Sequence, residues 1–117
     1  MLKIYGLKNC DSCRKALKWL TQAKIPHVFL DIREDGVPQA KLADWLDRLG
    51  WETVLNRRST SWRDLADSQK ANMNSTKAHR LATKYPTLIK RPVFDNEAGI
   101  LMVGFTKQTQ TALKTVQ

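Results

Sequence analysis

Two cysteines three positions apart are the side chains of this sequence best suited to chemistry. Cys10 and Cys13 form a Cys-x-x-Cys motif, and the 117 residues include no other cysteine. Apolar residues alternate over 2–7, which predicts a strand. From Cys13 onward they follow the spacing of an amphipathic helix, at positions 13, 16, 17 and 20. The motif therefore lies where a strand passes into a helix.

This placement gives the two sulfur atoms different surroundings. Cys10 is expected at or just before the helix N-cap, where unpaired N–H groups favour a thiolate, and Lys8 and Arg14 add positive charge. We therefore predict that Cys10 is the nucleophile, with a pKa below the ~8.5 of an ordinary cysteine. Cys13 lies on the buried stripe, so it serves either as the resolving thiol or only in packing.

A metal site is not expected. A structural zinc ion takes four ligands, and the remaining candidates, His27 and His79, are far from the motif in sequence. Two close cysteines without a secretory signal instead indicate a reducing compartment and a reversible or catalytic dithiol.

Length, composition and charge predict one soluble domain. The chain is long enough to bury a core, and 42% of its residues are apolar. No apolar run approaches a membrane span and no signal peptide precedes Leu2, so we expect a cytoplasmic protein without a membrane partner. The net charge of +9 favours anionic partners. Because the sequence has no block of like charges and no nucleic-acid motif, we expect no direct DNA binding. We also expect a monomer.

The order of predicted elements indicates an α/β chain. A second strand over 27–32 is mostly apolar, so we expect it to be buried on both faces and to complete a parallel βαβ unit with the first strand and helix. From about 38 to 86 the chain is mainly helical, with stops at Gly50 and Pro86. Ser61 is a candidate cap within this stretch.

The last third of the chain returns to strands. Strands over 93–95 and 100–103 flank a turn and form a hairpin, and Thr106 caps a final helix. A Cys-x-x-Cys near a βαβ unit is typical of the thioredoxin-like fold. We interpret the chain as a single domain, 1–117, in which the mainly helical stretch of about 38–86 is inserted between the second strand and the C-terminal hairpin.

At this point the residues resemble those of the ArsC/Spx family, most closely its YffB-like branch, over essentially the whole chain. The resemblance implies the thioredoxin-like fold and a cytosolic, thiol-dependent chemistry. The segments that carry it are Tyr5-Gly6-Leu7-Lys8-Asn9-Cys10-Asp11, Lys15-Ala16, Trp19-Leu20, Gly50-Trp51, Val54-Leu55-Asn56, Ile89-Lys90-Arg91-Pro92 and Val103-Gly104-Phe105.

The resemblance implies roles for individual residues. Cys10 corresponds to the family's nucleophile, Arg91 to a substrate-binding arginine, and Pro92 to a proline that is cis beside the active site. A guanidinium group holds an oxyanion or carboxylate through two hydrogen bonds and lowers the pKa of a nearby thiol.

Further binding residues are implied around the nucleophile and in the helical stretch. The family pattern includes an arginine after the second helix, which is either Arg57 or Arg58, and Spx-like spacing favours Arg58. Lys8 and Asn9 flank the nucleophile and complete the predicted substrate-binding set.

Two departures from the family pattern affect the expected function. Arsenate reductases carry a third arginine near the end of the last strand, where this chain has Phe105, so weak or no arsenate activity is expected. Most YffB-like members lack a second cysteine, whereas this chain has Cys13, as the redox-sensing Spx regulators do.

The resemblance leaves two functions open. The first is a glutathione-dependent thiol reductase of the arsenate reductase type. It has no bound cofactor, takes glutathione as co-substrate, acts on an anionic small molecule, and has glutaredoxin as a further candidate partner. The alternative is an Spx-like transcriptional regulator that docks on RNA polymerase and is switched by a disulfide between Cys10 and Cys13. A family member without catalysis is a third interpretation.

Overall fold

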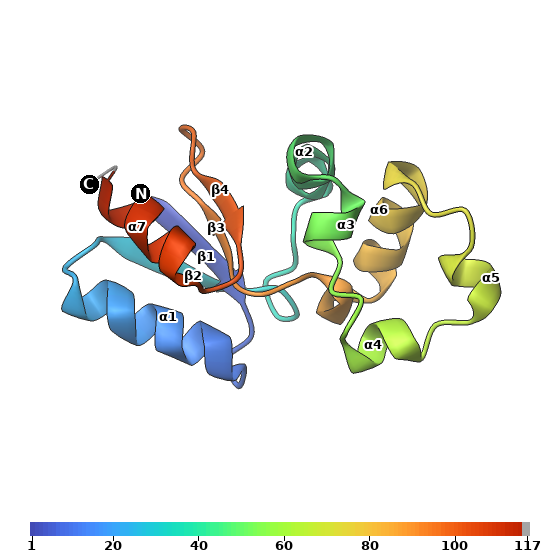
Figure 1. Cartoon of the computed structure of the whole chain (residues 1–117), viewed down its shortest axis with the longest axis horizontal. Helices are drawn as coiled ribbons and strands as arrows, with labels where there is room; N and C mark the ends of the chain where they lie inside the picture. Colours follow the sequence, from blue (N-terminus) through green and yellow to red (C-terminus); the bar gives the residue numbers. More distant parts are fainter. Residues whose placement is uncertain (116–117) are drawn as a thin grey trace. The chain divides into compact units, whose positions relative to one another are not determined.

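The computed structural model describes residues 1–115, which form two compact units (Figure 1). The sheet unit is built from both ends of the chain, residues 1–35 and 91–115, and the helical unit comprises residues 36–90. The helical unit interrupts the sheet unit between its second and third strands, as the sequence predicts. The interpretation of the whole chain as one domain stays a prediction.

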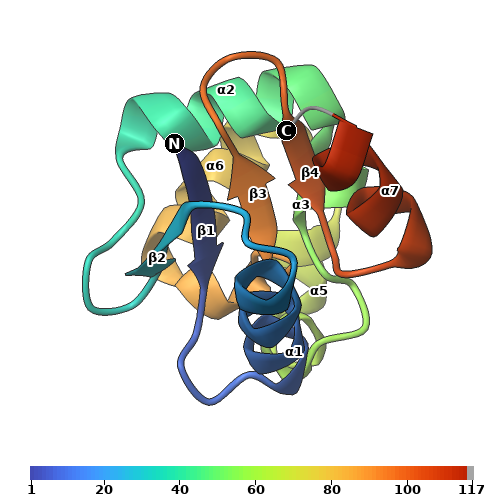
Figure 2. The same cartoon turned by 90° about the vertical axis from the view of Figure 1, so that its left-hand side faces the viewer.

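The sheet unit contains a four-stranded mixed sheet, and Figure 2 shows its strands in the order β2-β1-β3-β4. The central strand β1 is parallel to β2 and antiparallel to β3, and β3 is antiparallel to β4. The predicted βαβ unit and C-terminal hairpin are therefore confirmed. The strands are β1 (Leu2–Gly6), β2 (His27–Asp31), β3 (Val93–Asp95) and β4 (Leu101–Val103).

The prediction that the second strand is buried on both faces is wrong. β2 is an edge strand with β1 as its one neighbour, and the Val28 side chain is 38% exposed. An apolar run of this length fits a central or an edge position equally well, since sequence periodicity does not specify a strand's neighbours.

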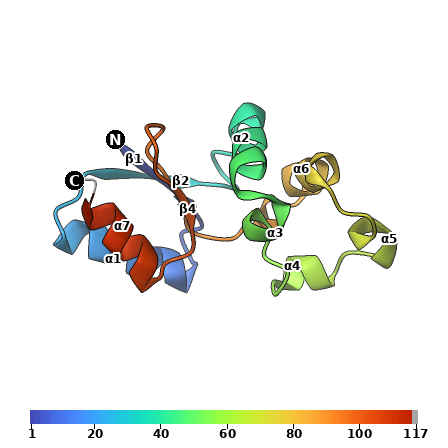
Figure 3. The ribbon, with the colours of Figure 1, turned by 45° about the horizontal axis from the view of Figure 1, so that its top comes forward.

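Two helices, α1 (Asp11–Gln22) and α7 (Lys107–Thr115), cover one face of this sheet (Figures 1 and 3). α1 ends at Gln22, and the backbone turns two residues later at Lys24, where φ is 57°. The buried core between the helices and the sheet consists of Leu2, Ile4, Ala16, Leu20, Ile25, Phe94, Ile100 and Leu113.

The predicted cap of the last helix is confirmed. The Thr109 N–H donates to the Thr106 hydroxyl at 3.2 Å, and the Thr106 N–H donates to the Thr109 hydroxyl at 2.9 Å. This reciprocal pair satisfies donors that would otherwise lack partners at the first turn of α7. Leu113 of α7 is buried, and Val116 lies outside the described residues.

The helical unit consists of short elements joined by tight turns. They are α2 (Gln39–Leu49), α3 (Trp51–Val54), α4 (Thr60–Arg63), α5 (Asp67–Lys70), α6 (Ser75–Lys84) and a 3₁₀ turn at Pro86–Leu88. α2 ends at Leu49, directly before Gly50, and α6 ends at Lys84, before Pro86, as predicted. The cap of α4 is not Ser61 but Ser59, whose hydroxyl accepts the Trp62 N–H at 3.1 Å. No helix within residues 1–115 is long and apolar enough to cross a membrane.

Candidate thiol site

Cys10 is the N-cap residue of α1, as the sequence predicts. Its backbone is extended, with φ −90° and ψ 124°, and its carbonyl accepts the first helical hydrogen bond from the Arg14 N–H at 3.0 Å. Its own N–H donates to the Leu7 carbonyl at 3.2 Å, which closes the loop between β1 and α1. The thiol is partly exposed and is not in a disulfide. Cys10 is therefore accessible at the end of a helix where N–H groups converge.

The surroundings of Cys10 favour its thiolate. Burial alone would raise the pKa of the thiol, but hydrogen bonds from the Cys13 N–H and thiol and from the Arg91 side chain, together with the Arg91 charge, outweigh it. The pKa of Cys10 consequently lies below its ordinary value. The direction agrees with the sequence prediction. The Cys13 N–H is one of the first-turn donors expected at the helix end, and Arg91 is the arginine that the family resemblance implies, whereas the hydrogen bond from the Cys13 thiol was not predicted.

Cys13 has the opposite electrostatic character. Its side chain is 0% exposed, and burial, together with the nearby Cys10 sulfur, raises its pKa to about 12 despite a hydrogen bond involving the Leu7 backbone. At neutral pH Cys13 therefore remains a thiol that donates toward the Cys10 thiolate. The two cysteines have pKa values displaced in opposite directions, a pattern typical of sites with divided chemical roles.

Arg91 and Pro92 belong to the sheet unit and lead into β3. The Arg91–Pro92 peptide bond is cis, the geometry that the family resemblance implies. The Pro92 carbonyl accepts the Gly104 N–H at 2.8 Å, so this segment is anchored to the chain that follows β4. The Arg91 side chain reaches Cys10, to which it supplies a hydrogen bond and a positive charge.

Lys8 and Asn9 form an exposed turn ahead of Cys10. The Lys8 ammonium group pairs with the Glu34 carboxylate at 2.9 Å, with both side chains well exposed. Arg14 donates from Nε to the Lys8 carbonyl at 3.1 Å. These contacts hold the turn, and the substrate-binding roles of Lys8 and Asn9 stay predictions.

Arg57 and Arg58 belong to the helical unit and are described within it. The Arg57 guanidinium lies over the Trp51 ring, 5.6 Å from its centroid, and Trp51 stacks on Trp62 with centroids 6.4 Å apart. Arg58 is exposed, and its N–H donates to the Asn56 side chain at 3.0 Å. Arg57 is thus engaged with an aromatic ring, which leaves Arg58 as the better candidate for binding an anion, and the approach of either arginine to Cys10 stays a prediction.

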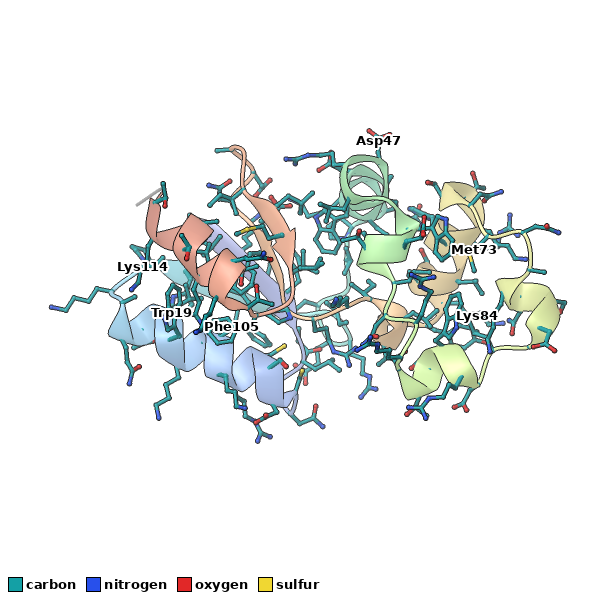
Figure 4. The ribbon with its side chains drawn as sticks, in the orientation of Figure 1. Trp19, Asp47, Met73, Lys84, Phe105 and Lys114 are labelled. Atoms are coloured by element: carbon teal, nitrogen blue, oxygen red, sulfur yellow. The ribbon has the colours of Figure 1, made fainter. Side chains whose placement is uncertain are left out.

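Phe105, at the position where the family resemblance implies a third arginine in arsenate reductases, is a packing residue. Its ring meets Trp19 of α1 edge to face, with centroids 6.0 Å apart and planes at 63°, and Figure 4 shows the two rings together beside Lys114. A surface cavity of about 510 Å³ is lined in part by Trp19. Its lining residues, Trp19, Gln22, Ala23, Ile25 and Lys114, include none of the predicted site residues.

Two residues that shape the site were not predicted from the sequence. Gly6, the last residue of β1, lies against the Cys13 side chain, and a methyl group at this position would overlap the Cys13 sulfur. Asp31, the last residue of β2, is 4% exposed and accepts hydrogen bonds from the turn that follows it. A glycine and an aspartate at strand ends are turn signals in the sequence, but their contacts depend on the strand register.

Among the described residues no three His, Cys, Asp or Glu side chains gather as metal ligands would. The site therefore consists of a thiolate, a buried thiol and a guanidinium group held on the sheet unit. These groups suit nucleophilic attack on an electrophilic centre that carries negative charge nearby.

Comparisons with known proteins agree on one family. The model of the ArsC family matches residues 5–113. A solved structure of a YffB protein is 37% identical, with 97% of this chain and 98% of that chain covered and a TM-score of 0.90. An arsenate reductase (ArsC) related protein from Brucella melitensis is 36% identical, with 95% and 92% covered and a TM-score of 0.77. The global transcriptional regulator Spx 1 of Lactococcus lactis subsp. lactis is 29% identical over 92% of this chain and 84% of the regulator.

Proposed function

The chain belongs to the ArsC family, and from this premise we propose that it is a thiol-dependent reductase with Cys10 as its nucleophile and glutathione as its reductant. The substrate class is an oxyanion or a mixed disulfide that carries negative charge. The observation that carries the proposal is the lowered pKa of Cys10, produced by Cys13 and Arg91 at the beginning of α1. A thiolate is the reactive form of cysteine, so this arrangement supplies a nucleophile at neutral pH.

Arg91 has two roles in this proposal. Its positive charge favours the Cys10 thiolate before substrate binds. Its guanidinium group offers paired N–H donors to the oxygens of an oxyanion or of a glutathione carboxylate. Arg58 is the second candidate for this contact, supplied by the helical unit.

The proposed cycle with a mixed disulfide consists of three thiol–disulfide exchanges. The Cys10 thiolate attacks one sulfur of the substrate, a Cys10–sulfur bond forms, and the other substrate sulfur leaves as a thiolate that takes up a proton. One glutathione thiolate then attacks the Cys10 sulfur, and the substrate sulfur bonded to it leaves as a thiolate. A second glutathione thiolate attacks the resulting Cys10–glutathione disulfide, which releases the Cys10 thiolate and forms glutathione disulfide. The substrate disulfide gains two electrons and two protons, which two glutathione molecules supply.

The surroundings of Cys13 favour glutathione as the attacking thiol. Burial is the main reason that the pKa of Cys13 reaches about 12, and the charge on Cys10 is a smaller one. When Cys10 is bonded to substrate its charge is removed, but the burial of Cys13 remains. The fraction of Cys13 present as thiolate at neutral pH therefore stays small, which favours an external thiol as the attacking group.

The test is a turnover assay with glutathione across a panel of oxyanions and glutathione mixed disulfides. The parent protein is compared with Cys10→Ser. Cys13→Ala, which removes the other sulfur atom, is the matched control. We expect turnover of at least one substrate, its loss in Cys10→Ser, and substantial retention in Cys13→Ala. Turnover that survives Cys10→Ser, or no turnover of any substrate by the folded parent protein, would contradict the proposal.

A second function has a specific observation in its favour. Relatives named as global transcriptional regulators Spx match along most of their length, and this chain has the paired cysteines expected of a redox switch. The alternative proposal is that a Cys10–Cys13 disulfide changes the binding of the protein to RNA polymerase. Binding to purified RNA polymerase, measured with oxidised and reduced protein and with Cys13→Ala, tests it. Redox-dependent binding together with no turnover would favour the regulator.

A further inference from the structure

Asp31 organises the turn at the end of β2. One carboxylate oxygen, Oδ1, accepts the N–H groups of Arg33 at 2.8 Å and of Glu34 at 3.0 Å. The Asp31 N–H donates to the Asp35 carboxylate at 2.9 Å. These three bonds fix residues 31–35 as a compact turn. In this turn the Asp31 carboxylate accepts N–H groups that a backbone carbonyl would otherwise accept.

The same turn holds the loop that leads to Cys10. The Lys8 N–H donates a hydrogen bond to the Asp31 carboxylate, and the Lys8 ammonium group pairs with Glu34 at 2.9 Å. The Lys8 carbonyl accepts from Arg14 of α1 at 3.1 Å. The N–H, carbonyl and ammonium groups of Lys8 thus all have partners, although its side chain is well exposed. Because the side chain is not buried, hydrogen bonds and the ion pair fix the position of this residue.

The position of Asp31 in the sheet explains why it can reach the loop. In the parallel pair β1–β2, Asp31 lies directly beside Gly6, the residue from which the loop departs. The Ile32 N–H then donates to the Gly6 carbonyl at 2.9 Å. The carboxyl ends of two parallel strands meet at one edge of the sheet, and here one strand carries the turn while the other carries the thiol loop.

Burial adds a second argument. The Asp31 side chain is 4% exposed, and a buried carboxylate is unfavourable unless hydrogen bonds compensate it. Its compensating donors come from two segments, its own turn and the loop before Cys10. A residue needed only to form the turn could satisfy the same backbone groups with an exposed side chain.

We propose that Asp31 is a positioning residue that holds the Leu7–Cys10 loop and thereby fixes the Cys10 sulfur at the N-terminus of α1. The inference rests on the proposed function in one respect, that Cys10 is the reactive thiol. It assigns Asp31 no contact with substrate.

Charge and position predict opposite effects of removing the carboxylate. A negative charge near a thiol disfavours the thiolate, so loss of the Asp31 charge alone would lower the pKa of Cys10. If Asp31 positions the loop, its loss misaligns Cys10 with its donors at Cys13 and Arg91, and the pKa of Cys10 rises. The sign of the change therefore distinguishes the two roles.

The experiment compares Asp31→Asn with Asp95→Asn. The asparagine at position 31 keeps one oxygen for the turn, but its NH₂ group cannot accept the Lys8 N–H. Asp95 is the matched control, because it is also buried, at 1% exposed, and accepts the Glu97 N–H at 2.8 Å in the hairpin. The measurement is the rate of Cys10 alkylation by iodoacetamide against pH, followed on the Cys10 peptide by mass spectrometry.

We expect the alkylation midpoint to rise in Asp31→Asn, with alkylation at neutral pH roughly threefold to tenfold slower, where tenfold corresponds to one pKa unit. Asp95→Asn should leave the midpoint unchanged even if it reduces stability. An unchanged or lower midpoint in Asp31→Asn would overturn the proposal. Alkylation needs no substrate, so this outcome is separate from the presence or absence of turnover.

A measurement on the unchanged protein covers the case in which Asp31→Asn does not fold. Amide hydrogen exchange, resolved by residue with NMR, should find the Lys8 N–H protected, because it donates to a buried carboxylate. Exchange of the Lys8 amide at the rate of an unstructured peptide would overturn the proposal independently of any variant.

Discussion

Gly6 of β1 and Cys13 of α1 fit each other: the absence of a side chain on Gly6 leaves the space that the Cys13 sulfur fills. A methyl group at position 6 would overlap the sulfur but would only touch the Cys13 Cβ and the Phe29 ring, each 3.4 Å away. The close approach of strand and helix at this point brings the buried thiol beneath Cys10.

Replacement of Gly6 by alanine should therefore destabilise the protein through the Cys13 sulfur. We expect Gly6→Ala to lower the free energy of unfolding by about 1–3 kcal/mol, the usual range for overpacking. In the double variant Gly6→Ala, Cys13→Ala the new methyl group occupies the space of the lost sulfur. Urea unfolding of both single variants and the double variant forms a double-mutant cycle. If the losses of unfolding free energy in the two single variants add up to the loss in the double variant, the methyl group at position 6 does not overlap the Cys13 sulfur.

Arg91 should control the reactivity of Cys10. Because its hydrogen bond and charge lower the pKa of Cys10, Arg91→Ala should move the alkylation midpoint to higher pH, and Arg91→Lys should move it less. Arg33→Ala removes the same charge from an exposed position of the sheet unit and serves as the control. Equal shifts in Arg91→Ala and Arg33→Ala would mean that net charge alone sets the midpoint.

Cys13 should make stability fall at alkaline pH. Its pKa of about 12 in the folded protein exceeds the ordinary value of a cysteine, so the unfolded chain releases this proton first. The stabilising contribution is complete below the ordinary pKa and is lost progressively as the pH rises toward about 12. Urea unfolding at several pH values above neutrality should therefore show a steeper loss of stability in the parent protein than in Cys13→Ala. Parallel curves would contradict this account of Cys13.

Mild oxidation should join Cys10 to Cys13. The two residues lie across the first turn of α1 and their thiols already share a hydrogen bond, so a disulfide needs little rearrangement. After treatment with diamide, mass spectrometry of the intact chain should find a loss of two hydrogens. Formation of intermolecular dimers alone would instead indicate that Cys13 serves only in packing.

Arsenate should be a poor substrate. Phe105 packs on Trp19 at the position where the family resemblance implies an arginine in arsenate reductases. The exposed Lys107, two residues on, cannot form a paired contact with an oxyanion. One missing charge-assisted contact costs about 1.5–3 kcal/mol, so a roughly tenfold to hundredfold loss of efficiency is expected. The assay is steady-state arsenate reduction with glutathione and glutaredoxin, beside an authentic arsenate reductase. Comparable efficiency would refute the argument from Phe105.

Local patterns were sufficient to predict much of the fold. The apolar stripe from Cys13 placed the thiols correctly on α1, and the turn residues around Gly99 indicated the hairpin. The edge position of β2 could not be predicted, because an apolar strand does not specify its neighbours. The same limitation applies to Gly6 and Asp31, whose contacts depend on the register between β1 and β2.

The site itself was predictable only in part. Position in a helix indicated the reactive cysteine, whereas Arg91 is distant in sequence and entered through the family resemblance. Lys8 illustrates the difficulty of assigning surface charges from sequence. Its ammonium group pairs with Glu34. The turn after β2 places Glu34 beside Lys8, and no local sequence pattern predicts this contact.

The construction of the sheet unit from both ends of the chain has a consequence for protein synthesis. β1 pairs with β3 through Lys3 and Asp95, so the ribosome completes the whole helical unit before the central strand can acquire its second neighbour. Arg91 emerges with that neighbour. A nascent or truncated chain thus exposes Cys10 without the guanidinium group that favours its thiolate. The positive charge that lowers the pKa of Cys10 is therefore available only after the last quarter of the sequence has been reached.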